Sequence, residues 1–237
     1  SQSLTDQTTA FIKRMMKLVT DDDEGSPNNW IHARIEAHIA SAIWLSNSTM
    51  LDTALDRWKK LTRSYIYIQA DGAKPVIPQT TRLKDIWKRV WDTPKFVGGL
   101  TMETCRDINH QGLGINAIVN SLVMANAQGI NILTGNDNRE RLTKFLEVMP
   151  RWMQARRDNP DGVCNNPIIL QGNDDTGKRL KDNPRRDAYP MVYALLVKDS
   201  RPLRLAKEDI DKSDPIKASR WLRKWDTLLA STLKPLE

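Results

Sequence analysis

Residues 112–128, GLGINAIVNSLVMANAQ, form the stretch that decides the fold. Apolar side chains recur there every three or four residues, and this spacing predicts an α-helix that is the most apolar of the chain. Its inward side is expected to carry Ile115, Ile118, Leu122 and Ala125. The two glycines near its start lack a Cβ atom, so another element can approach the helix backbone closely there.

Helical periodicity also runs through most of the chain on both sides of this stretch. We expect helical segments at residues 11–19, 31–45, 53–67, 139–156 and 213–232, with a short amphipathic piece at 83–91 inside a long loop. The best strand pattern, at 192–197, is weak. Seven or eight amphipathic helices joined by polar loops predict an all-α fold built from antiparallel helical hairpins.

Composition narrows the class of partner. Apolar residues make up 40% and charged residues 27% of the 237 positions, as is ordinary for a globular protein. The net charge of +7 favours an anionic partner such as a nucleic acid, a membrane surface or an acidic polysaccharide. The basic residues are dispersed, which is more typical of a solvated surface than of a nucleic-acid footprint. No stretch is apolar for long enough to span a bilayer, so we expect no membrane partner.

One segment, Cys105-Arg106-Asp107-Ile108-Asn109-His110-Gln111-Gly112-Leu113-Gly114, gathers several chemically active groups at the start of the apolar helix. If the turn is already helical, Arg106, Asp107 and His110 share one face. The carboxylate would then orient the imidazole beside a positive charge. A structural histidine at a helix N-terminus is the competing interpretation.

Cys105 and Cys164 are compatible with one disulfide or with two free thiols.

Two further clusters carry candidate residues. Asn28 or Asn29 can cap a helix, and Asn29, His32 and Glu36 then fall on one helical face, beside Trp30. An amide there suits hydrogen bonding to a substrate carboxylate, although a capping asparagine followed by a polar face is the simpler interpretation. The other cluster consists of Arg185, Arg186, Tyr189 and Tyr193. Guanidinium groups near a phenol stabilise its phenolate, while packing is the commoner role of tyrosine.

Together these motifs resemble the alginate lyase superfamily of polysaccharide lyases. The resemblance rests on Asn28-Asn29-Trp30, on Cys105-Arg106-Asp107-x-x-His110-Gln111-x-Leu113-Gly114, on residues 125–131 and on Arg186 with Tyr193, and it covers roughly residues 10 to 200. It implies a single domain over residues 1–237 with an α/α toroid, incomplete or compact, of helical hairpins around a cleft. Part of the family's N-terminal helices is expected to be lacking, supplied by a missing segment or a companion chain.

The resemblance also implies an activity, the cleavage of polyuronates such as alginate or glucuronan by β-elimination. Asn29 would neutralise the uronate carboxylate and His110 would transfer a proton. Tyr193, or Tyr189, would be the phenolic acid/base, with Arg186 and Arg106 as carboxylate or phenolate partners. Substrate-binding residues would be Asn28, Trp30, His32, Arg106, Arg185 and Tyr189. No metal or organic cofactor is needed, because amide and guanidinium groups can neutralise the carboxylate. The expected location is secreted or periplasmic.

Two other functions compete with this one. A non-catalytic carbohydrate-binding or interaction protein could use the same helical scaffold. A basic helical nucleic-acid binder is more remote, since no recognition motif occurs. Motifs for nucleophilic hydrolases, for zinc sites and for phosphate loops are absent from the sequence.

Overall fold

The computed structural model describes residues 2–20, 28–77, 91, 95–105, 108–154 and 163–164 of the chain. Within these residues the fold is all-α, as predicted, and contains no β-strand. The helices there are α1 (Gln2–Thr20), α2 (Asn29–Trp44), α3 (Ser48–Tyr65), the short 3-10 helix η1 (Gln69–Asp71), α5 (Ile108–Ala127) and α6 (Asn138–Gln154). The expected helices at 83–91 and 213–232 and the strand pattern at 192–197 lie wholly or almost wholly outside the described residues.

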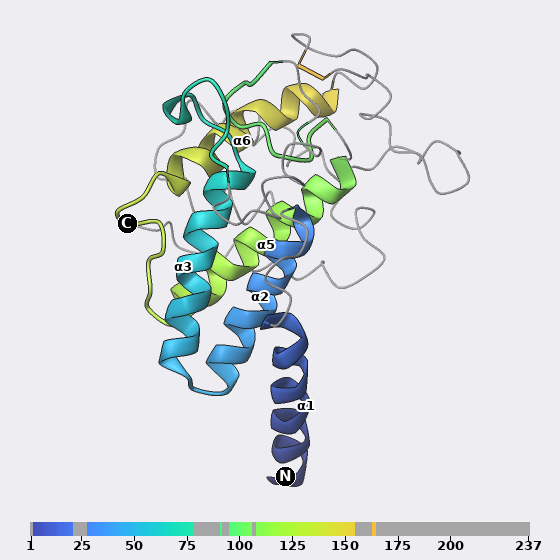
Figure 1. Ribbon diagram of the computed structural model, residues 1–237, viewed down its shortest axis with the longest axis vertical. Helices are drawn as coiled ribbons and strands as arrows, with labels where there is room; N and C mark the ends of the chain where they lie inside the picture. The colour runs from blue at the N-terminus through green and yellow to red at the C-terminus, as the bar shows by residue number, and fades with distance from the viewer. Residues whose placement is uncertain are drawn as a thin grey trace, which may run out of the picture.

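Helices α2 and α3 form an antiparallel hairpin (Figure 1). The chain reverses at Leu45 to Asn47, where Ser46 adopts a positive φ of 50°. The Asn47 side chain then accepts a hydrogen bond of 3.0 Å from the backbone N–H of Met50 and caps α3. This cap starts α3 at Ser48, so the start predicted near residue 53 is wrong by about one helical turn.

Helix α5 packs against α2 and supplies much of the core. The four residues that the sequence places on its inward side, Ile115, Ile118, Leu122 and Ala125, are all fully buried, which confirms that prediction. The indole Nε1 of Trp58 on α3 donates a hydrogen bond of 3.0 Å to the backbone carbonyl of Ile118, so α3 is fixed to the same helix. Helix α5 begins at Ile108 and not at Gly112, which brings His110 inside its first turn.

After α3 the chain runs extended beside a second segment. Backbone hydrogen bonds join Tyr67 to Leu100, Gly99 to Tyr67 and Met102 to Tyr65, at distances of 2.8 to 2.9 Å. They align the end of α3 with the chain just before α5. The turn formed by residues 101–105 follows directly, and its position between α2, α3 and α5 makes it the centre of the candidate site.

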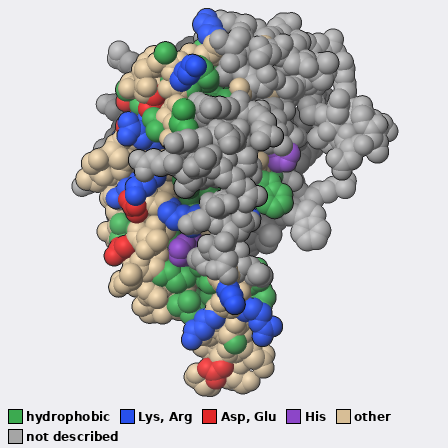
Figure 2. Space-filling view, in the orientation of Figure 1, with side chains coloured by type: hydrophobic (Ala, Val, Ile, Leu, Met, Phe, Trp, Pro, Cys, Tyr) green, Lys and Arg blue, Asp and Glu red, His purple; other side chains and the backbone are tan. Residues whose placement is uncertain are grey.

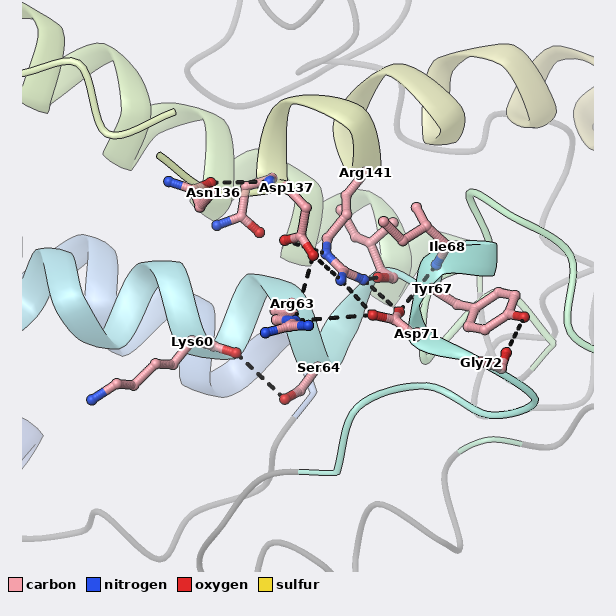
Figure 3. Close-up of polar contacts among 12 residues, drawn as sticks. Lys60, Arg63, Ser64, Tyr67, Ile68, Asp71, Gly72, Asn136, Asp137 and Arg141 are labelled. Carbon is pink, nitrogen blue, oxygen red and sulfur yellow. Dashed lines mark hydrogen bonds and ion pairs between the residues drawn. The ribbon is translucent and has the colours of Figure 1, made fainter. Parts of the chain in front are cut away.

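The buried guanidinium of Arg141 connects helix α6 to the end of α3 by hydrogen bonds (Figure 3). Arg141 donates hydrogen bonds to both oxygens of Asp71, to both oxygens of Asp137 and to the backbone carbonyl of Ile66, at 2.6 to 3.1 Å. Arg63 lies 3.5 Å from Asp137 on the outer side of this group. The arrangement joins α3, η1 and α6 through one side chain.

Helix α1 projects from the rest of the described helices, and only part of it packs against α2 (Figure 1). Its apolar stripe is divided, because Met16 is buried whereas Phe11 is 61% exposed and Leu4 is 65% exposed. Thr9 accepts a hydrogen bond from the indole of Trp44 at 3.1 Å, which ties α1 to the end of α2. Basic and hydrophobic side chains lie together on this projecting helix (Figure 2).

Candidate functional site

The turn at residues 101–105 is hydrogen-bonded to the first turn of α5. The hydroxyl groups of Thr101 and Thr104 both donate to Oε1 of Gln111, at 3.1 and 2.6 Å. The backbone N–H of Thr101 also donates to the Thr104 hydroxyl at 2.9 Å, which closes the turn on itself. All three side chains are fully or almost fully buried. The position of His110, the residue before Gln111, therefore depends on this turn.

The same turn is hydrogen-bonded to α2 and α3 through Glu103, which has no exposed surface. Its Oε2 atom accepts one hydrogen bond of 3.0 Å from the backbone N–H of Asn29 and another of 2.9 Å from the Tyr65 hydroxyl. Asn29 is the first residue of α2, where backbone N–H groups have no partner within the helix. A carboxyl group is favourable at that position because the N-terminal end of a helix carries partial positive charge.

Gly114 lets α5 come close to this group. A Cβ atom at position 114 would collide with the hydroxyl group of Tyr65. The absence of a side chain is therefore required for the approach of α5 to α3, as the sequence predicted for the glycines of this helix. The starts of α2 and α5, far apart in the sequence, are connected through the turn at residues 101–105.

The Asn28-Asn29-Trp30 segment separates into three roles. Asn28 is the N-cap of α2, since its Oδ1 accepts a hydrogen bond of 3.2 Å from the backbone N–H of Trp30, and it is buried. The side chain of Asn29 is also buried, but its Oδ1 atom has no hydrogen-bond partner among the described residues. Trp30 is 62% exposed beside it. A cap explains Asn28 and leaves Asn29 and Trp30 unexplained by local structure.

His32 lies on the same face of α2 and is almost completely buried. Burial lowers the pKa of His32 to about 3, so the imidazole is neutral near pH 7. Its ring contacts the Tyr65 ring edge-on, with 4.7 Å between the ring centroids. Neither ring nitrogen has a hydrogen-bond partner within the described part of the chain. His32 therefore offers a neutral donor and a neutral acceptor, and cannot supply positive charge to a carboxylate.

Asn116 on α5 is a further buried residue whose polar atoms lack partners. It is 2% exposed, and both ends of its amide lack a hydrogen-bond partner in the described structure. One helical turn later, Asn120 donates a hydrogen bond of 2.7 Å to Oε1 of Glu36 on α2. Asn116 lies four residues before Asn120 on α5, as His32 lies four residues before Glu36 on α2, so each precedes that hydrogen bond by one helical turn of its own helix. Asn29, His32 and Asn116 are called the unpartnered polar group below.

Cys105 and Cys164 form a disulfide, where the sequence alone was compatible with one disulfide or with two free thiols. It joins the last residue of the turn to a segment 59 residues later in the chain, and both half-cystines are buried. The turn that holds Asn29 and the start of α5 is thus also fixed covalently.

Of the other residues predicted for the site, His110 lies among the described residues and six lie outside them. His110 is half-buried in the first turn of α5. Arg106 and Asp107 lie outside the described residues, and so do Arg185, Arg186, Tyr189 and Tyr193. The structure therefore brings the start of α2 and the start of α5 together, and leaves the arginine and tyrosine parts of the prediction as predictions.

Sequence reasoning missed Glu103, Tyr65 and Asn116. Glu103 is 74 residues from Asn29 and 38 residues from Tyr65, so no local pattern relates them. A weak signal exists for Asn116, because an asparagine inside the most apolar helix of the chain is unusual among buried residues. For Glu103, the available signal is an acidic residue two positions before a cysteine in an otherwise uncharged segment, which is not specific.

No three His, Cys, Asp or Glu side chains among the described residues are placed to hold a metal ion together. None of the helices in the described ranges has the length and apolar character required to cross a membrane.

Comparison with known proteins adds no relative. No protein-family model matches the chain, and no curated protein or solved structure matches it. The resemblance to alginate lyases therefore rests on the motifs quoted above.

Proposed function

We propose that this protein is a polysaccharide lyase that cleaves an anionic uronate polymer by β-elimination, on an α/α toroid of which the described helices are a part. The observation that carries the proposal is the buried turn at residues 101–105, which is hydrogen-bonded to Asn29 at the start of α2 and to Gln111, the residue after His110, at the start of α5. Asn29 and His110 are the two assigned catalytic residues that lie among the described residues.

The chemistry of β-elimination accounts for the residue types. A base removes the proton from C5 of the uronate, the C4–O4 bond breaks as the C4–C5 double bond forms, and an acid protonates the leaving O4 atom. The C5 proton becomes acidic enough only when the neighbouring carboxylate is neutralised. We assign hydrogen bonding of the carboxylate to Asn29 and proton transfer to His110, with Tyr193, or Tyr189, as the phenolic acid/base.

We assign the positive charge that neutralises the carboxylate to arginine. His32 is neutral near pH 7, because burial lowers its pKa to about 3, so it is suited to a hydroxyl group and not to a charge. We assign the charge to Arg186 and Arg106, with Arg185 nearby in the sequence. The net charge of +7 favours the approach of an anionic polymer. Trp30, exposed next to Asn29, offers a flat surface on which a sugar ring can stack.

The test is incubation with a panel of polyuronates while the absorbance of the unsaturated product is followed. His110→Ala should lower turnover on the order of 10²–10⁴-fold while the helical circular dichroism is unchanged, since a positioned proton-transfer group contributes about that factor. His38→Gln, which changes a buried histidine of α2 that is assigned no role, is the control and should leave turnover unchanged. Full activity in a folded His110→Ala protein would exclude the assigned role.

Asn29→Ala separates function from helix capping. Since Asn28 and not Asn29 caps α2, removal of the Asn29 amide should lower kcat/KM with little change in melting temperature. Asn28→Ala should instead cost about 1 kcal/mol of stability. Binding of polyuronate without cleavage would favour a carbohydrate-binding protein, which the exposed Trp30 also suits. Tight, salt-sensitive binding to duplex DNA without cleavage would favour a nucleic-acid binder.

A further inference from the structure

We propose that Glu103 is a positioning residue of this site: its buried carboxyl group fixes Asn29 through the backbone and fixes His32 through Tyr65. The inference rests on the function proposed above for Asn29, and it adds a residue that no motif of the sequence includes. It starts from one atom, Oε2 of Glu103, which accepts hydrogen bonds from two different helices.

The first of these hydrogen bonds sets the orientation of Asn29. The backbone N–H of Asn29 points to Glu103 at 3.0 Å, and the residue before it, Asn28, caps the next N–H groups of α2. Because Asn29 is the first helical residue, its peptide plane is not held by a helical hydrogen bond of its own N–H. Glu103 supplies that constraint from a segment 74 residues away, and so determines the direction in which the Asn29 side chain leaves the helix.

The second hydrogen bond sets the position of His32. The Tyr65 hydroxyl donates to the same oxygen at 2.9 Å, and the Tyr65 ring lies edge-on against the His32 ring. Tyr65 has no exposed surface, and Gly114 of α5 closes the space beside its hydroxyl group. A displacement of the Glu103 carboxyl group would therefore move the phenol, and with it the only ring contact described for His32.

Glu103 is itself rigidly placed. Its backbone N–H donates to the Thr101 hydroxyl at 3.3 Å, and Thr101 in turn donates to Gln111 of α5. Cys105, two residues later, is in the disulfide. A side chain held in this way can transmit geometry, because displacing it requires movement of a closed and covalently linked turn. Errors of about 1 Å in the placement of a group that binds substrate can cost about a hundredfold in rate.

The use of a single oxygen for both hydrogen bonds makes the role testable. In Glu103→Gln the amide oxygen can take the place of Oε2 and accept both hydrogen bonds through its two lone pairs. Glu103→Ala removes both. If Glu103 acts by geometry, Glu103→Gln should keep kcat/KM on the polyuronate that is cleaved within about threefold of wild type. Glu103→Ala should lower kcat/KM about ten- to a hundredfold. Glu147→Ala is the matched control, because it changes a partly buried carboxylate paired with Lys144 on α6. It should leave kcat/KM unchanged.

A double-mutant cycle separates positioning from a merely structural role. Asn29→Ala keeps the backbone N–H that Glu103 accepts, so Glu103→Ala should lower the melting temperature equally with and without Asn29→Ala. Its effect on kcat/KM, in contrast, should be smaller in the Asn29→Ala background, because only the part that acts through Tyr65 and His32 remains there. Equal losses of kcat/KM in both backgrounds would overturn the positioning of the Asn29 side chain by Glu103.

A readout independent of activity distinguishes this inference from the proposed function. Hydrogen exchange of the Asn29 backbone amide should be faster in Glu103→Ala than in wild type and nearly unchanged in Glu103→Gln. If no polyuronate is cleaved by the wild-type protein, the proposed function fails while exchange still decides whether Glu103 fixes Asn29. Unchanged exchange of the Asn29 amide in a folded Glu103→Ala protein overturns the inference, whatever the activity.

Discussion

Two buried polar groups in this protein differ in how completely their hydrogen bonds are made. Around Arg141, each of the five N–H donors of the guanidinium has an acceptor, and Asp71 and Asp137 use both of their oxygens. In the unpartnered polar group of Asn29, His32 and Asn116, five buried side-chain atoms have no partner among the described residues. Both groups are nearly or wholly buried around their central residues, so exposure does not explain the difference.

The comparison indicates different roles for the two groups. A buried donor or acceptor without a partner costs about 1–3 kcal/mol, so sites that keep several of them are commonly those where water, ions or ligands complete the hydrogen bonds. A fully satisfied group such as that of Arg141 has its donors occupied and serves to join α3, η1 and α6. Changes in the unpartnered polar group should therefore affect function more than stability. Changes in the Arg141 group should affect stability more than function.

The largest effect is expected from Asp71→Ala. It removes two hydrogen bonds of 2.6 Å from a guanidinium that has no exposed surface, and so leaves a buried charge with fewer partners. Such losses cost about 3–5 kcal/mol of unfolding free energy. Asp56→Ala, which breaks an exposed ion pair with Lys60, is the control and should cost less than about 1 kcal/mol. Equal denaturant midpoints for the two variants would show that the Arg141 group does not stabilise the fold.

A loss on the order of 2–4 kcal/mol is expected when the disulfide is removed in the double variant Cys105→Ser, Cys164→Ser. The link closes a long loop, with 59 residues of separation, and restricts the unfolded chain accordingly. Hydrogen exchange should also increase in residues 101–105, because the turn loses its covalent attachment. A reducing agent should shift the denaturant midpoint of the wild-type protein in the same direction. No response to either treatment would argue against the link.

Helices were the part of the fold that the sequence predicted well. The spacing of apolar residues is a local property, and the described helices α2, α3, α5 and α6 occupy the predicted regions. The starts of α3 and α5 were wrong for identifiable reasons. Asn47 caps α3 earlier than the apolar pattern begins, and the glycines at 112 and 114 lie inside α5, where Gly114 is needed for contact with Tyr65.

The site was predicted only where its residues are close together in the sequence. Asn29 and His32 lie one turn apart on α2, so their shared face could be read from spacing, and both are buried on that face. Glu103, Tyr65 and Asn116 reach them only through the packing of α2, α3 and α5. Long-range pairing of this kind leaves no periodic pattern, and a single buried carboxyl group looks like any other acidic residue until its partners are known.

A smaller effect, of opposite sign, distinguishes two asparagines on α5. Asn116→Leu replaces a buried amide that has no partner, so the unfolding free energy should rise by about 1–3 kcal/mol, while binding of polyuronate weakens. Asn120→Leu, one turn later, removes the donor of the 2.7 Å hydrogen bond to Glu36 and should lower the unfolding free energy by about 1–2 kcal/mol. Chemical denaturation of both variants measures the contrast. Destabilisation of similar size in both would mean that Asn116 is satisfied in solution.

The smallest effect concerns pH and His32. The folded-state pKa of about 3 lies below the ordinary value of 6.5, because burial penalises the charged imidazole. Between these values the unfolded chain binds a proton that the folded protein does not, so stability falls as pH falls from 6.5 towards 3. His32→Phe keeps a ring against Tyr65 and removes the titration. From pH 6.5 to about pH 5 the wild type should lose about 1.5 kcal/mol more than the variant does.

This pH range separates His32 from the Arg141 group. Burial raises the pKa of Asp137, but its hydrogen bond to Arg141 and the charges of Arg141 and Arg63 lower it by more, so its net pKa lies below the ordinary 3.8. Its contribution to stability is present above 3.8 and is lost only as pH falls through the lower folded-state pKa. The difference in urea denaturation between wild type and His32→Phe above about pH 5 therefore reports on His32 and not on Asp137. Parallel pH profiles for wild type and His32→Phe would show that a partner holds the His32 proton in the folded state, and that the unpartnered polar group is completed in solution.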